Sequence, residues 1–211
     1  MIVATVLLYG LTAVPVARRL GVTGSTRSRP LLVGGDPWVT ELGAALHGLG
    51  LDVLMWAGGP EERTRITEAG LALAPGELLA TATGEGAELE GITSVLLLTG
   101  EDDFNALAAT LLRGQGGPEV YRLAEREEGR GVVAPFLSGE VLFAPGLSAH
   151  ALAGRHRSGA TIQVRPADLP LEPGHDLLFT VDRTGRLRPA TTRAGTDHHA
   201  DGHAVLLGPA L

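Results

Sequence analysis

The chain has 211 residues, a formal net charge of -7 and a pI near 5.5. This acidic balance argues against nucleic acid as the main partner, because binding to phosphates needs a basic surface. There is no cysteine, which excludes disulfides, thiolate metal ligands and a cysteine nucleophile, and fits a reducing compartment. With 44% hydrophobic but only 4% aromatic residues, the chain can bury one aliphatic core and a small second one.

The N-terminal stretch MIVATVLLYGLTAVPVA carries no charge and is followed directly by Arg18 and Arg19. Its length lies at the lower limit for crossing a bilayer. A signal peptide should begin with a basic segment, which is absent, and a buried helix finds no second apolar partner elsewhere in the sequence. The arginines favour a third interpretation, the end of a transmembrane helix with a positive cytoplasmic flank. We therefore expect an apolar helix at 1–20 and a polar linker at 21–29.

The stretch 30–57 predicts a strand, a glycine turn, a helix and a second strand, which is half of a mononucleotide-binding fold. Its opening apolar run is typical of a strand buried on both faces of a parallel sheet. Gly34 and Gly35 allow a sharp turn. Asp36 suits the N-cap of a helix, and Pro37 suits the first helical position, where no N–H is needed.

This turn departs from the dinucleotide fingerprint G-x-G-x-x-G, in which the second glycine admits the pyrophosphate. Gly34 is in register, but Asp36 stands at the second glycine position and Val39 at the third. The acidic residue that would hold a ribose is replaced by Ala57. These departures lower the expected affinity for a nucleotide. The turn alone leaves two interpretations open, a βα turn that binds no nucleotide and a nucleotide site.

Alternating strands and helices continue the pattern after the opening unit. Strands are expected at 71–74, 93–99, 118–123 and 141–143, and helices at 61–69, 104–113 and 147–153. In an open α/β sheet, ligands collect outside the carboxyl ends of the strands at the switch point. Thr99, Asp102 and Asn105 lie at such an end. The alternative is that Asp102 is only a helix N-cap and Asn105 only a polar residue of the first turn.

From Gly159 onward, short apolar runs separated by Pro, Gly and Asp predict a small antiparallel β module. The runs are 161–164, 177–181, 185–188 and 204–207, with a hairpin turn at 181–186. The segment DHHADGH at 197–203 offers imidazole and carboxylate ligands that suit zinc or nickel. Its Asp-Gly turn signal favours a polar hairpin loop instead, and we predict no metal site there.

The order of these pieces resembles the C-terminal part of a bacterial monovalent cation:proton (Na+/H+) antiporter. Leu8–Gly21 (LYGLTAVPVARRLG) looks like the final transmembrane helix of the sodium/proton exchanger family. The GGDPW turn at 34–38 and the run TGEDDFNALA at 99–108 look like the RCK N-terminal (TrkA-N type) domain, which regulates conductance of potassium. The β module is similar to the segment that follows this domain in such antiporters.

The resemblance implies an α/β fold, a Rossmann-like doubly wound parallel sheet with an N-terminal apolar helix and a small C-terminal β module. The expected parts are 1–20 (helix), 21–29 (linker), 30–158 (RCK N-terminal domain) and 159–211 (β module). It also implies a homodimer through the Rossmann-type domain, a membrane cation transporter as partner, and NAD or AMP as the ligand. Carried over by position, the cofactor-binding residues are Gly34, Gly35, Asp36, Pro37, Trp38, Ala57, Thr99 and Asp102.

The expected function is that of a regulatory domain, cytoplasmic but attached to the cell membrane. With at most one membrane helix, the chain is not itself a transporter, which needs many helices with ionisable residues inside them. One alternative is a small NAD-dependent oxidoreductase. That enzyme would need an acid or base, such as the Tyr and Lys pair of short-chain reductases, and Tyr121 lies inside a predicted strand without a lysine. Another alternative is a scaffold or dimerisation domain that has lost its ligand, which Asp36 supports.

Overall fold

The computed structural model describes residues 27–78, 91–113, 117–125, 140–144, 146–191 and 201–210. None of the helices within these ranges combines the length and the apolar character that crossing a bilayer requires. The apolar helix expected at 1–20 lies outside the described residues, as do most of the linker and both His198 and His199.

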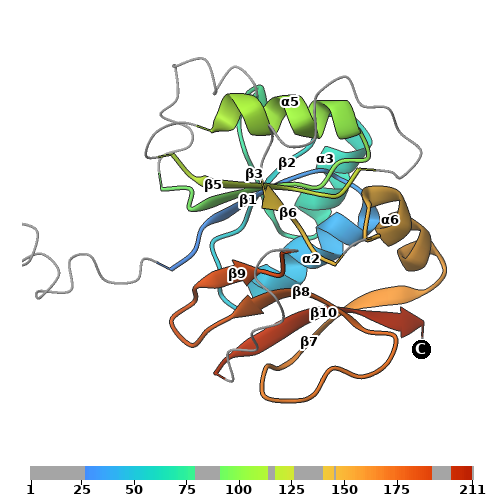
Figure 1. Cartoon of the computed structure of the whole chain (residues 1–211). Helices are drawn as coiled ribbons and strands as arrows, with labels where there is room; N and C mark the ends of the chain where they lie inside the picture. The colour runs from blue at the N-terminus through green and yellow to red at the C-terminus, as the bar shows by residue number, and fades with distance from the viewer. Residues whose placement is uncertain are drawn as a thin grey trace, which may run out of the picture.

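A parallel sheet of six strands, in the order β3-β2-β1-β4-β5-β6, forms the larger part of the described structure (Figure 1). The strands are β1 Pro30–Val33, β2 Leu54–Trp56, β3 Ala72–Leu73, β4 Ser94–Leu97, β5 Glu119–Arg122 and β6 Glu140–Val141. All neighbouring pairs run parallel. This confirms the expected Rossmann-like sheet. The strand order reverses between β1 and β4, which is the topological switch point of such a fold.

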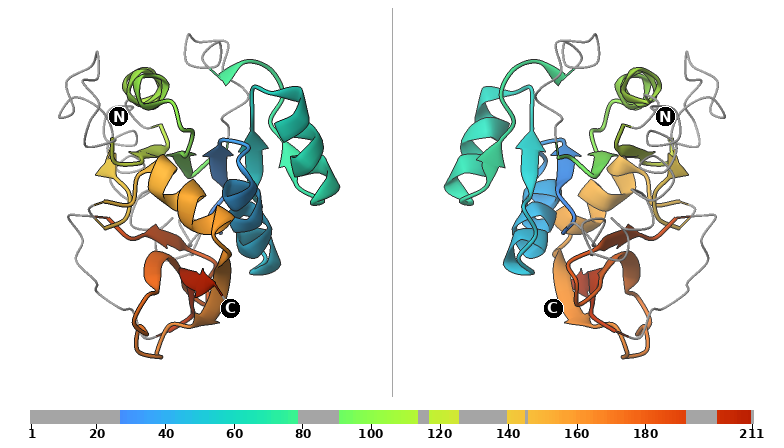
Figure 2. Two further views of the ribbon diagram at one scale, coloured as in Figure 1. Left: turned by 90° about the vertical axis from the view of Figure 1, so that its right-hand side faces the viewer. Right: turned by 90° about the vertical axis from the view of Figure 1, so that its left-hand side faces the viewer.

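Helices cover both faces of this sheet (Figure 2). They are α2 Pro37–Gly48, α3 Pro60–Glu68, α5 Asp102–Leu112 and α6 Ala149–Arg157. Side chains of α2, α3 and α6 share one hydrophobic cluster, whereas side chains of α5 belong to a second cluster on the opposite face. Alternate residues of β1 point into the two clusters, Leu32 into the first and Leu31 and Val33 into the second. This two-sided burial explains why β1 reads as an uninterrupted apolar run.

The C-terminal part is a four-stranded antiparallel sheet in the order β7-β10-β8-β9. Its strands are β7 Ala160–Pro166, β8 Asp176–Val181, β9 Leu187–Pro189 and β10 His203–Ala210. The predicted antiparallel module is thus confirmed, together with its hairpin turn between β8 and β9. In that turn the Asp182 carboxylate accepts hydrogen bonds from the backbone N–H groups of Thr184 (2.9 Å) and Arg186 (3.0 Å).

The small sheet packs against the α2 side of the large sheet, and one hydrophobic cluster contains side chains of both. Phe143, which follows β6, meets Phe179 of β8 edge-on with ring centroids 5.4 Å apart. The backbone N–H of Phe143 also donates to the Ala190 carbonyl at 2.6 Å. On the other side, Ser28 just before β1 accepts a hydrogen bond from the Leu187 N–H at 2.9 Å. The two sheets therefore share a packed core.

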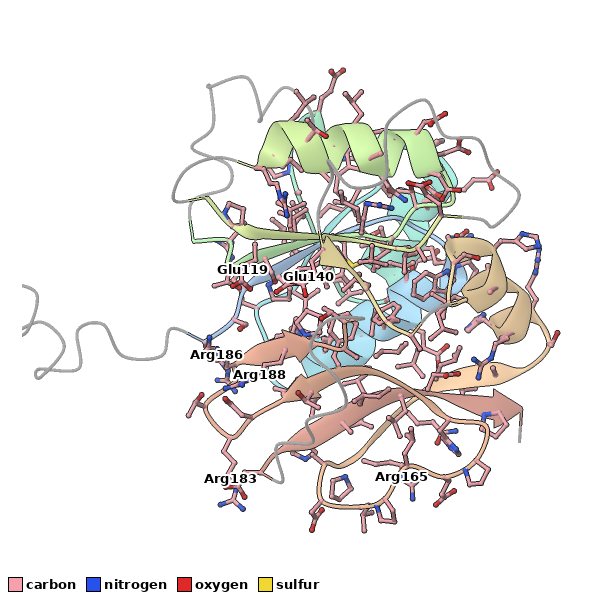
Figure 3. All side chains as sticks on the ribbon, viewed as in Figure 1. Glu119, Glu140, Arg165, Arg183, Arg186 and Arg188 are labelled. Atoms are coloured by element: carbon pink, nitrogen blue, oxygen red, sulfur yellow. The ribbon has the colours of Figure 1, made fainter. Side chains whose placement is uncertain are left out.

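Charged side chains lie around Tyr121, whose ring is buried between the sheets. Its hydroxyl donates to Glu119 at 2.8 Å, and Glu140 and Arg186 are close enough to act on it electrostatically. Figure 3 shows Glu119 and Glu140 on the large sheet and Arg186 and Arg188 at β9, on facing sides of this junction. Burial, and then the hydrogen bond to Glu119, raises the pKa of Tyr121 well above its usual range.

Candidate functional site

An open cleft of about 410 Å³ lies at the carboxyl ends of β1, β2 and β4, at the switch point of the large sheet. Ligands of open α/β sheets bind at this place. The lining residues come from the turns after these strands and from the first turns of α3 and α5. They are Gly34, Gly35, Asp36, Trp56, Ala57, Gly58, Glu62, Thr99, Gly100, Glu101 and Phe104.

Most of the site residues inferred from the sequence come together in this cleft. Those that line it are Gly34, Gly35, Asp36, Ala57 and Thr99.

The other three inferred residues lie outside the cleft lining. The Trp38 side chain, on α2, is 1% exposed and packs in the hydrophobic core. Pro37 occupies the exposed first position of α2, and Asp102 is the first residue of α5.

Gly34 and Gly35 are required by close packing within the chain. Gly34 has a φ of 142°, and a Cβ added to it would lie 3.3 Å from the backbone of Leu98, at the end of β4. A Cβ added to Gly35 would lie 2.3 Å from the Cβ of Glu62 on α3. The first glycine therefore lets two strands meet closely, and the second lets α3 approach the turn. Both glycines are explained without a ligand.

Glu62 holds α3 against this glycine turn. Its carboxylate accepts a hydrogen bond from the Gly59 N–H at 3.1 Å, which caps the start of α3. The Arg65 guanidinium, one helical turn further along, donates to the Gly35 carbonyl, and Arg63 donates to the Ala57 carbonyl at 3.4 Å. These arginines thus bond to backbone carbonyls beside the cleft, and neither is among its lining residues.

Asp36 occupies the N-cap position of α2, as predicted, but its side chain does not cap the helix. The expected side-chain cap is therefore wrong. The Asp36 backbone carbonyl accepts instead from the N–H groups of Val39 (2.9 Å) and Thr40 (3.0 Å), and Asp36 is one of the residues that line the cleft. Together with Glu62 and Glu101, this makes every charged side chain in the described lining of the cleft acidic.

Two aromatic rings form an apolar part of the wall. Trp56, the last residue of β2, and Phe104, in the first turn of α5, stack with ring centroids 6.1 Å apart and planes 14° apart. The Trp56 indole N–H donates to the Gly76 carbonyl at 3.1 Å, which fixes the orientation of the ring. Both residues could have been found from the sequence. Trp56 lies at the carboxyl end of a predicted strand, and Phe104 lies at the start of a predicted helix that follows another strand.

Asn105 fixes the loop between β4 and α5. It is 2% exposed; its amide donates to the Thr99 carbonyl at 2.9 Å, and its oxygen accepts from the Thr99 hydroxyl at 2.7 Å. Glu101, not Asp102, occupies the N-cap position of α5. The alternative that made Asp102 an N-cap is therefore wrong by one residue. Asn105 holds Thr99 in place through these two hydrogen bonds.

A metal site is not formed by the residues that the structure describes, since they contain no group of three or more His, Asp or Glu side chains suited to holding an ion. In the predicted polar loop, Asp201 forms an exposed ion pair with Arg183 at 3.3 Å, and His203 begins β10.

No protein-family model and no curated protein matches this chain. What can be inferred about function therefore rests on the fold and the cleft. They establish a Rossmann-like α/β domain that is consistent with a nucleotide-binding domain.

Proposed function

We propose that this chain is a regulatory ligand-binding domain of the RCK N-terminal (TrkA-N) type, which controls monovalent cation transport by a cation:proton antiporter or related system. The observation that carries the proposal is the cleft of about 410 Å³ at the switch point, beside the Gly34 turn. NAD and AMP are the ligands that the family resemblance implies.

A regulatory role is supported over an oxidoreductase by the groups in and near the cleft. The chain has no lysine, so no Tyr and Lys pair can be formed. Tyr121 lies on β5 outside the cleft lining, and its raised pKa keeps the phenol neutral. General acid-base catalysis needs a group placed at the substrate with a pKa near the working pH. The proposal therefore assigns no catalytic residue.

The proposal includes attachment to the cell membrane by residues 1–20 and a homodimer formed through the Rossmann-type domain. On the α2 side the small sheet already covers the large one. On the opposite side, α5 exposes Leu107 (45%) and Leu111 (43%), one helical turn apart, which supports α5 as the dimer face. The full chain should be recovered in the membrane fraction and a chain starting at Arg27 in the supernatant. Recovery of both in the supernatant would contradict the membrane part.

Ligand binding is tested by thermal unfolding in the presence of NAD, NADH, AMP, ATP and adenosine. A ligand present at a hundred times its Kd should stabilise the fold by about 2.7 kcal/mol.

A substitution at Gly100 blocks the cleft with little risk to the fold. Gly100 lines the cleft, and an added Cβ there would have no neighbour within 4 Å, unlike one at Gly34. Gly100→Leu should abolish the thermal shift. Gly48→Leu is the matched control, since Gly48 also has open space around it but lies at the end of α2, outside the cleft lining. A shift that survives Gly100→Leu, or no shift with any of these ligands, would contradict the proposal.

A further inference from the structure

The charge of the cleft distinguishes among the ligands that a Rossmann-type site can take. Asp36, Glu62 and Glu101 line it, and no arginine does so within the described residues. A phosphate monoester such as AMP carries close to two negative charges near neutral pH, and each phosphate in the diphosphate bridge of NAD carries one. Like charges disfavour each other most strongly where solvent is partly excluded. The described lining therefore offers a phosphate three carboxylates and no cation to pair with.

The backbone of the turn is also poorly suited to a phosphate. In a dinucleotide site the second glycine lets the pyrophosphate approach, and the N-terminus of the following helix donates N–H groups. Here Asp36 stands at the second glycine position, and Pro37 supplies no N–H at the first position of α2. The space against Gly35 is filled by Glu62, which the Gly59 N–H holds in place.

The same groups suit a ligand that brings hydroxyls, amines or a positive charge. Carboxylates accept hydrogen bonds from hydroxyl and amino groups, and those to an ionised acceptor are stronger than neutral ones. The half-buried rings of Trp56 and Phe104 offer an apolar surface for a planar base, and aromatic faces also attract cations. A nucleoside carries a planar base and a ribose with free hydroxyls.

We infer that the cleft binds a nucleoside without a phosphate group, and that a positive charge on the ligand tightens binding. This inference rests on the proposed ligand-binding function and specifies its ligand class. In this site, hydrogen bonds from the ribose hydroxyls to Asp36, Glu62 and Glu101 take the place of the phosphate contacts of a dinucleotide site.

Isothermal titration of the full chain with two matched ligand pairs tests the inference. Adenosine and AMP differ by the phosphate, and S-adenosylhomocysteine and S-adenosylmethionine differ by one methyl group and its sulfonium charge. We expect adenosine to bind at least tenfold more tightly than AMP, and S-adenosylmethionine severalfold more tightly than S-adenosylhomocysteine. Both preferences should weaken as salt is raised, because they are electrostatic.

Substitutions on α3 test whether the cleft carboxylates cause the preference for adenosine over AMP. Glu62→Gln keeps an acceptor for the Gly59 N–H and removes the charge, so the adenosine-to-AMP ratio of affinities should fall at least threefold. Glu61→Gln removes the same charge from the same exposed helical turn, outside the cleft lining, and should leave the ratio unchanged. Asp36→Asn is a second variant should Glu62→Gln fail to fold, because the Asp36 side chain makes no capping bond.

The outcomes separate this inference from the proposed function. If AMP or NAD binds more tightly than adenosine, the inference is overturned while the proposed function stands. If adenosine is preferred but the ratio is equally insensitive to Glu62→Gln and Asp36→Asn, the role given to the carboxylates is wrong. If none of the ligands binds, the proposed function and the inference fail together.

Discussion

Replacing Asn105 should loosen the cleft and destabilise the protein, because this buried amide makes two of the hydrogen bonds that hold Thr99 just after β4. In Asn105→Ala the Thr99 carbonyl loses its donor at 2.9 Å, and the Thr99 hydroxyl loses its acceptor at 2.7 Å. Each hydrogen bond contributes about 1 kcal/mol net, and a polar group left unpaired adds to the loss. We expect a loss of about 2 to 3 kcal/mol in the free energy of unfolding.

A double-mutant cycle isolates one of these bonds. Thr99→Val removes the hydroxyl but keeps the carbonyl, so its coupling with Asn105→Ala should be about 1 kcal/mol. Thr110→Val is the matched control, since the Thr110 hydroxyl bonds to Ala106 of its own helix and not to the cleft loop; its coupling with Asn105→Ala should be near zero.

Urea denaturation gives the four free energies, and thermal unfolding gives an independent check. For a chain of this size, a loss of 1 kcal/mol lowers Tm by roughly 2 to 4 °C, so Asn105→Ala should lower it by roughly 4 to 12 °C. A loss below about 0.5 kcal/mol, which is typical of surface substitutions, would refute the supporting role of Asn105. A coupling no larger than that of the Thr110 control would refute the bond to the Thr99 hydroxyl.

Other predictions concern the rest of the fold. Burial alone would raise the pKa of Asp182, but hydrogen bonds from Thr184 and Arg186 hold this pKa below its usual range. The ionised Asp182 carboxylate therefore stabilises the fold above the unfolded pKa of about 3.9, and this stabilisation is lost as the pH falls below that value. Asp182→Ala should accordingly lower the free energy of unfolding, measured by urea denaturation, by about 1 kcal/mol near pH 7 and by less at pH 3. The raised pKa of Tyr121 predicts stability that falls as pH rises above about 10, and Tyr121→Phe should remove part of that alkaline loss. The Trp38 indole N–H has no hydrogen-bond partner in the described structure, so Trp38→Phe should cost only about 1 to 3 kcal/mol, from lost packing, and leave Trp56 as a single fluorescent reporter of the cleft.

The large sheet could be predicted because its signals are local. The apolar runs of β1 and β4 are buried on both faces, which leaves no polar residue within them to obscure the pattern. Pro37 marks the start of α2 correctly, because its fixed φ and missing N–H are tolerated at the first helical position. The four runs of the small sheet were recognised in the same way, from turn residues between short apolar segments.

Features that depend on packing between distant segments could not be predicted. Phe143 is buried with a φ of 68°, a conformation that side chains rarely adopt, and no sequence pattern indicated it. Arg122, 3% exposed at the end of β5, pairs with Glu125 at 3.3 Å although it reads as an ordinary polar strand residue. Glu62 lies in the helix expected at 61–69, which the sequence does not connect with the glycine turn, and only the placement of α3 against Gly35 brings it into the cleft.

The cleft shows why a glycine turn is weak evidence for a ligand. Gly34 is explained by the close approach of the Leu98 backbone, and Gly35 by the Glu62 side chain, so both would be required in a domain that binds nothing. The stronger indication of a ligand lies in side chains that packing does not require at this edge. Asp36 could cap its helix and does not, and Trp56 and Phe104 leave a half-buried aromatic surface beside that carboxylate. The fold fixes where a ligand binds, and these side chains decide its chemistry.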